Sequence, residues 1–174
     1  MEELKKQECP LCKTKNLTLA EEEKEVPHFG KVYLFSMVCS NCNYKVSDVE
    51  AVDVKEPVKI TFTVENVKDL NVKVVKSSSA SVKLVELRMD MTPGPASIGF
   101  ISNIEGLITK FEEVLKAQKE TAEEDEDKTK AKNLLKKIWK IKCGDIPLKI
   151  VIEDPSGNSA ILSDKAKVEK LKVK

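Results

Sequence analysis

Four of the five cysteines stand in two Cys-x-x-Cys pairs, Cys9 with Cys12 and Cys39 with Cys42. A Cys-x-x-Cys pair can fold back as a knuckle that points both sulfurs at one place, so two knuckles supply the four ligands of a tetrahedral zinc ion. Four thiolates around one ion leave no coordination position for water or a substrate. The pattern therefore predicts a single structural Zn²⁺ and no Lewis-acid chemistry.

Other uses of the cysteines stay open but fit less well. A redox pair belongs at the junction of a βαβ unit, which the alternating, acidic residues around these pairs do not resemble. Five cysteines are an odd number for a disulfide framework, and an iron–sulfur cluster or another metal could use the same thiolates. His28, the only histidine, could replace a ligand, although its Pro/Gly turn favours an exposed loop position. Cys143 is predicted to be a small buried residue rather than a nucleophile, because no histidine lies near it in sequence.

The segments around the knuckles are expected to form a zinc ribbon over residues 1–56. "LTLAEEEKEV" and "KVYLFSMV" predict two strands between the pairs, and "YKVSDVEAVDV" offers a third after them. Such a small unit buries little apolar surface, so it needs the metal, which can add about 10–16 kcal/mol to folding. Asn43 follows the last cysteine, where a left-handed backbone is often required, and Asn tolerates that conformation.

The remaining residues, 57–174, are expected to form a mainly β domain. Short runs rich in β-branched residues, "VKITFTV", "NVKVVK" and "SVKLVEL", predict strands with one buried face. Near the C-terminus, "IPLKIVIED" and "SAIL" flank a tight "DPSGN" turn, a pattern typical of a β-hairpin. The lysine-rich tail after Leu162 is interpreted as a solvated end.

A helical hairpin is expected as an insertion in this domain, at about 103–142. Ser102 and Glu105 form a capping box at the start of the first helix, and Gly106 within that helix indicates that something packs closely there. "KETAEEDEDK" is interpreted as a solvated turn between the helices. The second helix carries an apolar stripe among lysines, and Trp139 beside that stripe is predicted to be buried within the hairpin.

The net charge and its distribution along the chain limit the classes of function that the sequence fits. The chain has 30 Lys and Arg against 29 Asp and Glu, which removes a global electrostatic argument for nucleic acid or an anionic membrane. Residues 1–56 carry 8 Lys and 11 acids, whereas residues 128–142 carry 7 Lys and no acid, so the charge is distributed locally. The N-terminus has no apolar signal segment and no run of 18 apolar residues occurs, so a cytoplasmic location is expected.

The sequence resembles the ZPR-type zinc-finger family, in particular its short archaeal members with a single module. The likeness runs from about Glu8 to Leu162 and rests on blocks in matching order and spacing, which are the cysteine pairs "CPLC" and "CSNC", "PHFGKVYLFSMVCSNCNYKVSDVE", "PGPASIGFISNIEGLI" and "IEDPSGNSAIL". It implies that the β domain is a double-stranded β-helix, of jelly-roll character, carrying an inserted antiparallel helix pair. Asn43 departs from the Gly that is usual in the family.

The resemblance also implies a function. Eukaryotic relatives have two such modules and bind the elongation factor GTPase that delivers aminoacyl-tRNA, assisting its folding. A non-enzymatic protein-interaction module with that partner is therefore expected. Loops on stiff scaffolds commonly carry recognition, so the "NIEGL" and "DPSGN" loops supply candidate contact residues, namely Asn103, Glu105, Gly106, Asp154, Ser156, Gly157 and Asn158. The same residues also fit a helix cap and a hairpin turn, and both roles can hold.

Two other classes of function fit the sequence less well. An RNA-binding zinc ribbon of translation or transcription is favoured by the basic second helix, but the acidic ribbon and the scarcity of aromatic residues oppose it. An enzyme is disfavoured, because the sequence contains no glycine-rich phosphate loop and no acid–base pair with an available histidine.

Overall fold

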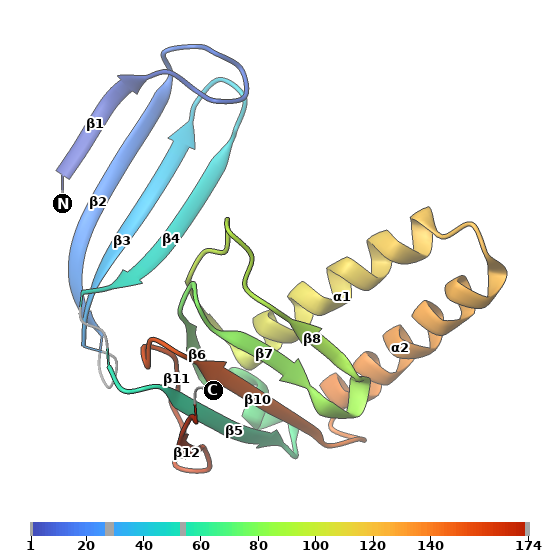
Figure 1. Ribbon diagram of the computed structural model, residues 1–174. Helices are drawn as coiled ribbons and strands as arrows, with labels where there is room; N and C mark the ends of the chain where they lie inside the picture. The colour runs from blue at the N-terminus through green and yellow to red at the C-terminus, as the bar shows by residue number, and fades with distance from the viewer. Residues whose placement is uncertain (1, 27–29, 53–54, 173–174) are drawn as a thin grey trace.

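The computed structural model describes residues 2–26, 30–52 and 55–172 (Figure 1). An upright four-stranded sheet, here called the ribbon sheet, stands over a region of two further sheets and a helix pair, here called the jelly-roll region (58–172). His28, expected in an exposed turn, lies outside the described residues.

The ribbon sheet is antiparallel with strand order β1-β2-β3-β4. Three of its strands confirm the sequence prediction: β2 (Leu17–Val26), β3 (Gly30–Cys39) and β4 (Lys45–Ala51). The strand β1 (Glu2–Gln7) was not predicted, because a mostly charged segment shows no apolar alternation. It forms because it pairs along β2, with Leu4 opposite Leu19.

The jelly-roll region contains two sheets, with orders β12-β5-β10-β7-β8 and β11-β6-β9. The predicted β-rich runs form strands with one buried face; in β5, for example, Ile60, Phe62 and Val64 are buried. The bounds of the strands are β5 (Val58–Val64), β6 (Lys73–Lys76), β7 (Ser81–Leu84), β8 (Met89–Met91), β9 (Phe100–Asn103), β10 (Leu148–Asp154), β11 (Ala160–Ile161) and β12 (Lys167–Lys170). Two short 3₁₀ turns, η1 (Val67–Asn71) and η2 (Val85–Leu87), connect them.

Two helices form the expected antiparallel pair, α1 (Ile104–Thr121) and α2 (Asp125–Cys143). The predicted acidic turn was too long, because its acids at 125–127 form the first turn of α2, where carboxylates are favoured by the helix dipole. Among the described residues, neither helix is both long and apolar enough to cross a membrane.

One continuous core joins the helix pair to the sheets. Its residues come from both sheets and both helices: Ile60, Phe62, Val64, Leu70, Val74, Ala80, Val82, Leu84, Leu87, Ile104, Leu107, Ile108, Phe111, Leu115, Ile138, Ile141, Leu148, Ile150, Ile152 and Ile161. None of the members comes from the ribbon sheet. The jelly-roll region therefore has a hydrophobic core of its own.

Two predictions about the C-terminal part were wrong or incomplete. The "DPSGN" turn does not close a hairpin, because β10 pairs with β5 and β7 whereas β11 pairs with β6 in the other sheet. A tight turn is visible in sequence, but which strands pair is decided by residues far apart along the chain. The lysine-rich tail is exposed as expected, yet part of it forms β12 along β5.

The ribbon sheet meets the jelly-roll region through close backbone contacts. Gly99 packs against the Val49 carbonyl, where a Cβ atom would collide with the oxygen, and its N–H donates to Asp48 Oδ1 at 2.7 Å. A small apolar cluster centred on Val32 and Val75 lies beside this contact. The ribbon is therefore attached through backbone fit and a few apolar side chains.

The connecting residues are held by the "DPSGN" turn. Lys55 N–H donates to the Ser156 carbonyl at 2.9 Å. Gly157 has φ of 69° and lies so close to the Glu56 carbonyl that no side chain would fit. The turn that was expected to close a hairpin thus clamps the chain that leaves the ribbon sheet.

Candidate metal centre

The first knuckle lies between β1 and β2. Cys9 N–H donates to the Thr14 carbonyl, and Lys13 N–H donates back to the Cys9 carbonyl, both at 2.9 Å. Lys13 has φ of 58°, in the left-handed region. These two bonds fold the segment so that both cysteine side chains point to the same side.

The second knuckle repeats this geometry at the end of β3. Cys39 N–H donates to the Tyr44 carbonyl at 2.8 Å, and Asn43 N–H donates to the Cys39 carbonyl at 3.0 Å. Asn43 has φ of 57°, which confirms the left-handed backbone predicted there. The matching role of Lys13 was missed, although its position one residue after the second cysteine of its pair was a sufficient signal.

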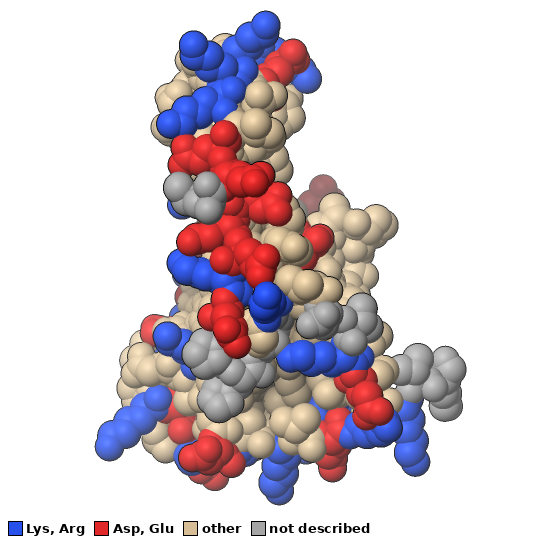
Figure 2. All heavy atoms as spheres, turned by 90° about the vertical axis from the view of Figure 1, so that its left-hand side faces the viewer, with Lys and Arg blue, Asp and Glu red and all other residues tan. Residues whose placement is uncertain are grey.

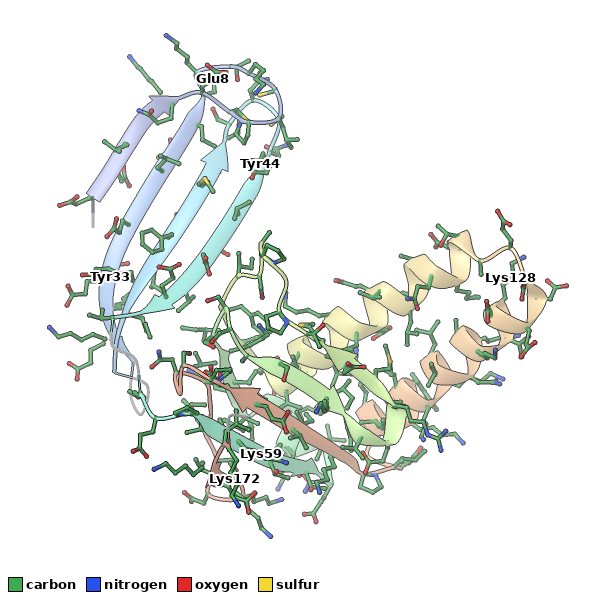
Figure 3. All side chains as sticks on the ribbon, in the orientation of Figure 1. Glu8, Tyr33, Tyr44, Lys59, Lys128 and Lys172 are labelled. Carbon is green, nitrogen blue, oxygen red and sulfur yellow. The ribbon has the colours of Figure 1, made fainter. Side chains whose placement is uncertain are left out.

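The knuckles lie side by side at the end of the ribbon sheet remote from the jelly-roll region, where Figure 3 labels Tyr44. Leu17 pairs with Cys39, and Ser40 N–H donates to the Asn16 carbonyl. Cys9, Leu17 and Cys39 are buried there and form the small core of this end of the sheet. Few apolar groups stabilise the knuckles, so an ion bound by the sulfurs would contribute much of their stability.

The four sulfurs form one cluster that could hold a metal ion. The Sγ atoms of the two cysteine pairs all lie within 4.8 Å of one another. Cys9 Sγ lies 3.7 Å from Cys42 Sγ, and Cys12 Sγ lies 3.7 Å from Cys39 Sγ. A tetrahedral zinc ion with Zn–S bonds of about 2.3 Å requires sulfurs about 3.8 Å apart. The cluster therefore fits a four-thiolate zinc centre.

The ionisation of the thiols also indicates a cation. Hydrogen bonds from the side chain and backbone of Thr14 lower the pKa of Cys12 to about 5. The Tyr44 backbone lowers the pKa of Cys42, but burial and the three neighbouring sulfurs outweigh it and raise that pKa to about 12. Four thiolates at this spacing therefore repel one another. A divalent ion removes this conflict, since it stabilises thiolates.

The fifth cysteine takes no part in the cluster. Cys143 is the last residue of α2 and is exposed, so the prediction that it is buried was wrong. Trp139, also predicted to be buried, is 64% exposed. The buried side of α2 belongs instead to Ala131, Ile138 and Ile141, and a residue that only flanks such a stripe turns toward solvent.

The first group of predicted contact residues forms the start of α1. Asn103, rather than the predicted Ser102, caps the helix, because its Oδ1 accepts from Gly106 N–H at 2.8 Å. Gly106 confirms the predicted close packing, since a Cβ atom there would collide with Ser102 Oγ. Glu105 is exposed. The capping role is thus present, and contact of these residues with a partner stays a prediction.

The second group surrounds a buried carboxylate. Asp154 is fully buried and accepts hydrogen bonds of 2.7–3.0 Å from the backbone N–H groups of Ser156, Asn158 and Ser159 and from the hydroxyls of Ser79, Ser156 and Ser159. Asn158 and Gly157 are buried too. These residues shape the turn; their contact with a partner stays a prediction. Sequence reasoning missed Ser79, because only the fold brings it to this turn.

Two family models match the chain, in sequence order. A ZPR1 zinc-finger domain matches residues 2–55, and a ZPR1 jelly-roll domain matches residues 68–174. The first match contains both knuckles. The second covers nearly all of the jelly-roll region.

Curated relatives show the same likeness. A ZPR1-like protein of Methanocaldococcus jannaschii is 36% identical over 99% of this chain and 91% of its own length. A ZPR1-like protein of Pyrococcus horikoshii is 38% identical over 98% of this chain and 78% of its own length. A zinc finger chaperone of Schizosaccharomyces pombe is 32% identical over 78% of this chain, which matches 30% of that longer protein.

Proposed function

Because this chain belongs to the ZPR1 family of zinc-finger proteins, we propose that it is a non-enzymatic binding protein that assists the folding of the elongation factor GTPase that delivers aminoacyl-tRNA. It would act in the cytoplasm. The name of the fission-yeast relative, a zinc finger chaperone, supports the chaperone role. The choice of partner rests on the family resemblance of the sequence.

One observation carries the proposal: the four-sulfur cluster lies at the free end of the ribbon sheet, with every ligand position supplied by the protein. One Zn²⁺ held by Cys9, Cys12, Cys39 and Cys42 would stabilise the knuckles and thereby fix the sheet as a rigid surface. The ion would supply structural cross-linking, and binding would be performed by the side chains of the sheet.

Metal content tests the first part of this proposal. The purified chain is expected to contain one zinc ion per molecule by mass spectrometry under native conditions. Cys39→Ser should lower that content strongly, because three thiolates bind zinc more weakly than four. Cys143→Ser is the matched control, since it makes the same chemical change outside the cluster. Equal zinc content in the three proteins would contradict the assignment of the ligands.

Partner binding tests the second part. Immobilised chain is expected to capture the purified elongation factor in at least one of its GDP and GTP states, and Cys39→Ser should capture less. Refolding of denatured elongation factor, followed by its nucleotide binding, should give a higher yield with the chain than with Cys39→Ser. Absence of capture in both nucleotide states would reject this partner.

The RNA-binding alternative has weaker support. Its basis is the lysine content of α2, but two of those lysines bind other elements of the molecule and two more form ion pairs with acids of the same helix. Lys137 Nζ donates to the Glu86 carbonyl, and Lys142 Nζ donates to Glu112 Oε2, both at 2.6 Å. RNA affinity that falls steeply with salt would favour this alternative.

A further inference from the structure

One face of the ribbon sheet forms a hollow of about 850 Å³, here called the ribbon groove. Ile98, from the loop between β8 and β9, borders it on the side of the jelly-roll region. The large apolar side chains that line the groove are Leu4, Leu19, Phe35, Met37, Val46 and Ile98. Leu4 is 61% exposed and Ile98 is 44% exposed, so part of this apolar surface is open to solvent.

Strand register places these side chains on one face. Leu4, Leu19, Met37 and Val46 are opposite one another in a single row across all four strands. Side chains of one strand return to the same face at every second residue. The rows that follow, two and four residues along each strand, therefore line the same face as the apolar row.

Those rows combine aromatic rings with carboxylates. Phe35 lies between Glu21 on β2 and Asp48 on β4 in the pairing register. Tyr33 likewise lies between Glu23 and Glu50. The two rings are neighbours, with centroids 6.2 Å apart. An aromatic stripe on β3 thus runs between two rows of acids.

Much of this negative charge has no cationic partner in the structure. Lys31 pairs with Glu23 at 3.2 Å, and Asp48 accepts from backbone N–H groups. Within residues 2–26, 30–52 and 55–172, no lysine or arginine forms an ion pair with Glu21 or Glu50. Figure 2, a view from the left-hand side of Figure 1, shows that acidic side chains gather in the middle of the upright part.

We propose that the ribbon groove docks a segment of a client protein in which apolar residues alternate with or flank lysine or arginine. Apolar side chains of that segment would cover the row that contains Leu19 and Met37. Its cations would lie over Tyr33 and Phe35 and pair with the flanking acids, since rings and carboxylates both attract cations. The inference deepens the proposed function, on which it rests, by placing the client on the ribbon sheet.

Charge complementarity selects this occupant. Phosphate groups of a nucleic acid would be repelled by the acidic rows. A second copy of this chain could offer its basic helix α2, but the apolar stripe of α2 is already buried in the core. Of the large apolar side chains of that helix, Trp139 is the exposed one. A single ring cannot cover the whole apolar row, so a client segment fits the groove better.

Peptide binding tests the proposal without the elongation factor. The probe is a short fluorescein-labelled peptide of leucine and lysine, followed by fluorescence anisotropy. It should bind more tightly than peptides in which glutamate replaces lysine or serine replaces leucine. Glu21→Lys and Glu50→Lys should each weaken binding about tenfold, because they place a like charge beside the peptide cations.

Glu22→Lys is the matched control, because Glu22 lies on the opposite face of β2 and the substitution makes the same change in net charge. It should bind the peptide as the unchanged chain does, and zinc content should be equal in all variants. Equal loss in Glu21→Lys and Glu22→Lys would overturn the groove as the site. Dimerisation of the chain that Glu21→Lys abolishes would overturn the client segment in favour of a second copy.

The two proposals can fail separately. A chain that binds the leucine–lysine peptide through the groove but captures no elongation factor would reject the proposed partner alone. Undiminished capture of the elongation factor by Glu21→Lys and Glu50→Lys would reject the groove alone.

Discussion

At the scale of single residues, Asp154 illustrates how one carboxylate can organise a turn. It lies fully buried at the end of β10 and accepts hydrogen bonds from backbone and hydroxyl groups of the residues that follow. Buried donors that lose their acceptor are costly, at about 1–3 kcal/mol each. The turn therefore depends strongly on this side chain, in addition to Gly157, whose positive φ no other residue type adopts easily.

Asp154→Ala is expected to lower the free energy of unfolding by about 3–5 kcal/mol, because it leaves several buried donors without an acceptor. Urea unfolding followed by the far-UV circular dichroism of the helices measures this. Glu153→Ala is the neighbouring control: Glu153 pairs with Lys59 and Lys83 near the surface and should cost at most about 1 kcal/mol. Similar losses for both variants would contradict the role of Asp154.

Stability should also depend on pH through Asp154. Burial raises the pKa of this carboxyl, but hydrogen bonds from Ser159 and Ser156 outweigh burial and hold it below its usual value. A lowered folded-state pKa means that the stabilisation is complete above the unfolded value of about 3.9 and is lost as pH falls through the folded value. Unfolding titrations from neutral to acidic pH should show this loss. Asp154→Asn should be less stable at neutral pH and should lose less stability on acidification.

At the scale of elements, the junction between the ribbon sheet and the jelly-roll region has little room. Gly99→Ala places a methyl group against the Val49 carbonyl, so it is expected to cost about 1–3 kcal/mol and to loosen β4 from β9. Hydrogen exchange of β4 amides should become faster. Gly94→Ala is the control, because nothing lies within 4 Å of a Cβ atom at that position. Identical exchange in the two variants would argue against a tight junction.

Elements whose signal is local were predictable from the sequence. The knuckles are short, and their cysteines and Asn43 show the need for a turned backbone directly. The segments of β2 to β4 lie between turn signals and the cysteine pairs, β5 alternates clearly, and the helices have regular apolar spacing. Each of these patterns reports the side of a segment that becomes buried.

Features that depend on contacts between residues far apart in the sequence were not predictable from the sequence. The charged segment of β1 forms a strand because it pairs with β2. The strand β10 does not pair with β11, the partner expected from the turn, because β5 and β7 pair with it on both sides. Trp139 is exposed because Ala131, Ile138 and Ile141 fill the buried side of α2. The ribbon groove was also not predicted. In the sequence its acids look like ordinary solvated residues, and only the strand register shows that they are neighbours of Tyr33 and Phe35.

At the scale of the whole molecule, the two parts should respond differently to loss of metal. The ribbon sheet contributes only to two small apolar clusters. The jelly-roll region has a large core of its own, to which no residue of the ribbon sheet belongs. Both tyrosines, Tyr33 and Tyr44, lie in the ribbon part, and both helices lie in the jelly-roll region. Spectroscopy can therefore follow each part separately.

Removal of zinc with a chelator is expected to abolish the near-UV circular dichroism of the tyrosines, because the metal supplies about 10–16 kcal/mol of apparent folding free energy to such a unit. The far-UV signal of the helices should persist. Cys39→Ser should behave like the chelated chain, and Cys143→Ser like the untreated one. Simultaneous loss of both signals would show that the two parts fold as one unit.

The clamp on the connecting residues also affects how the protein is made. The ribbon sheet ends at Ala51, whereas the contacts to Lys55 and Glu56 are made by Ser156 and Gly157, which follow much later in the sequence. N-terminal units generally fold first during synthesis. The newly made ribbon can thus take up metal before the clamp exists, because the clamp closes only after Ser156 and Gly157 have been synthesised.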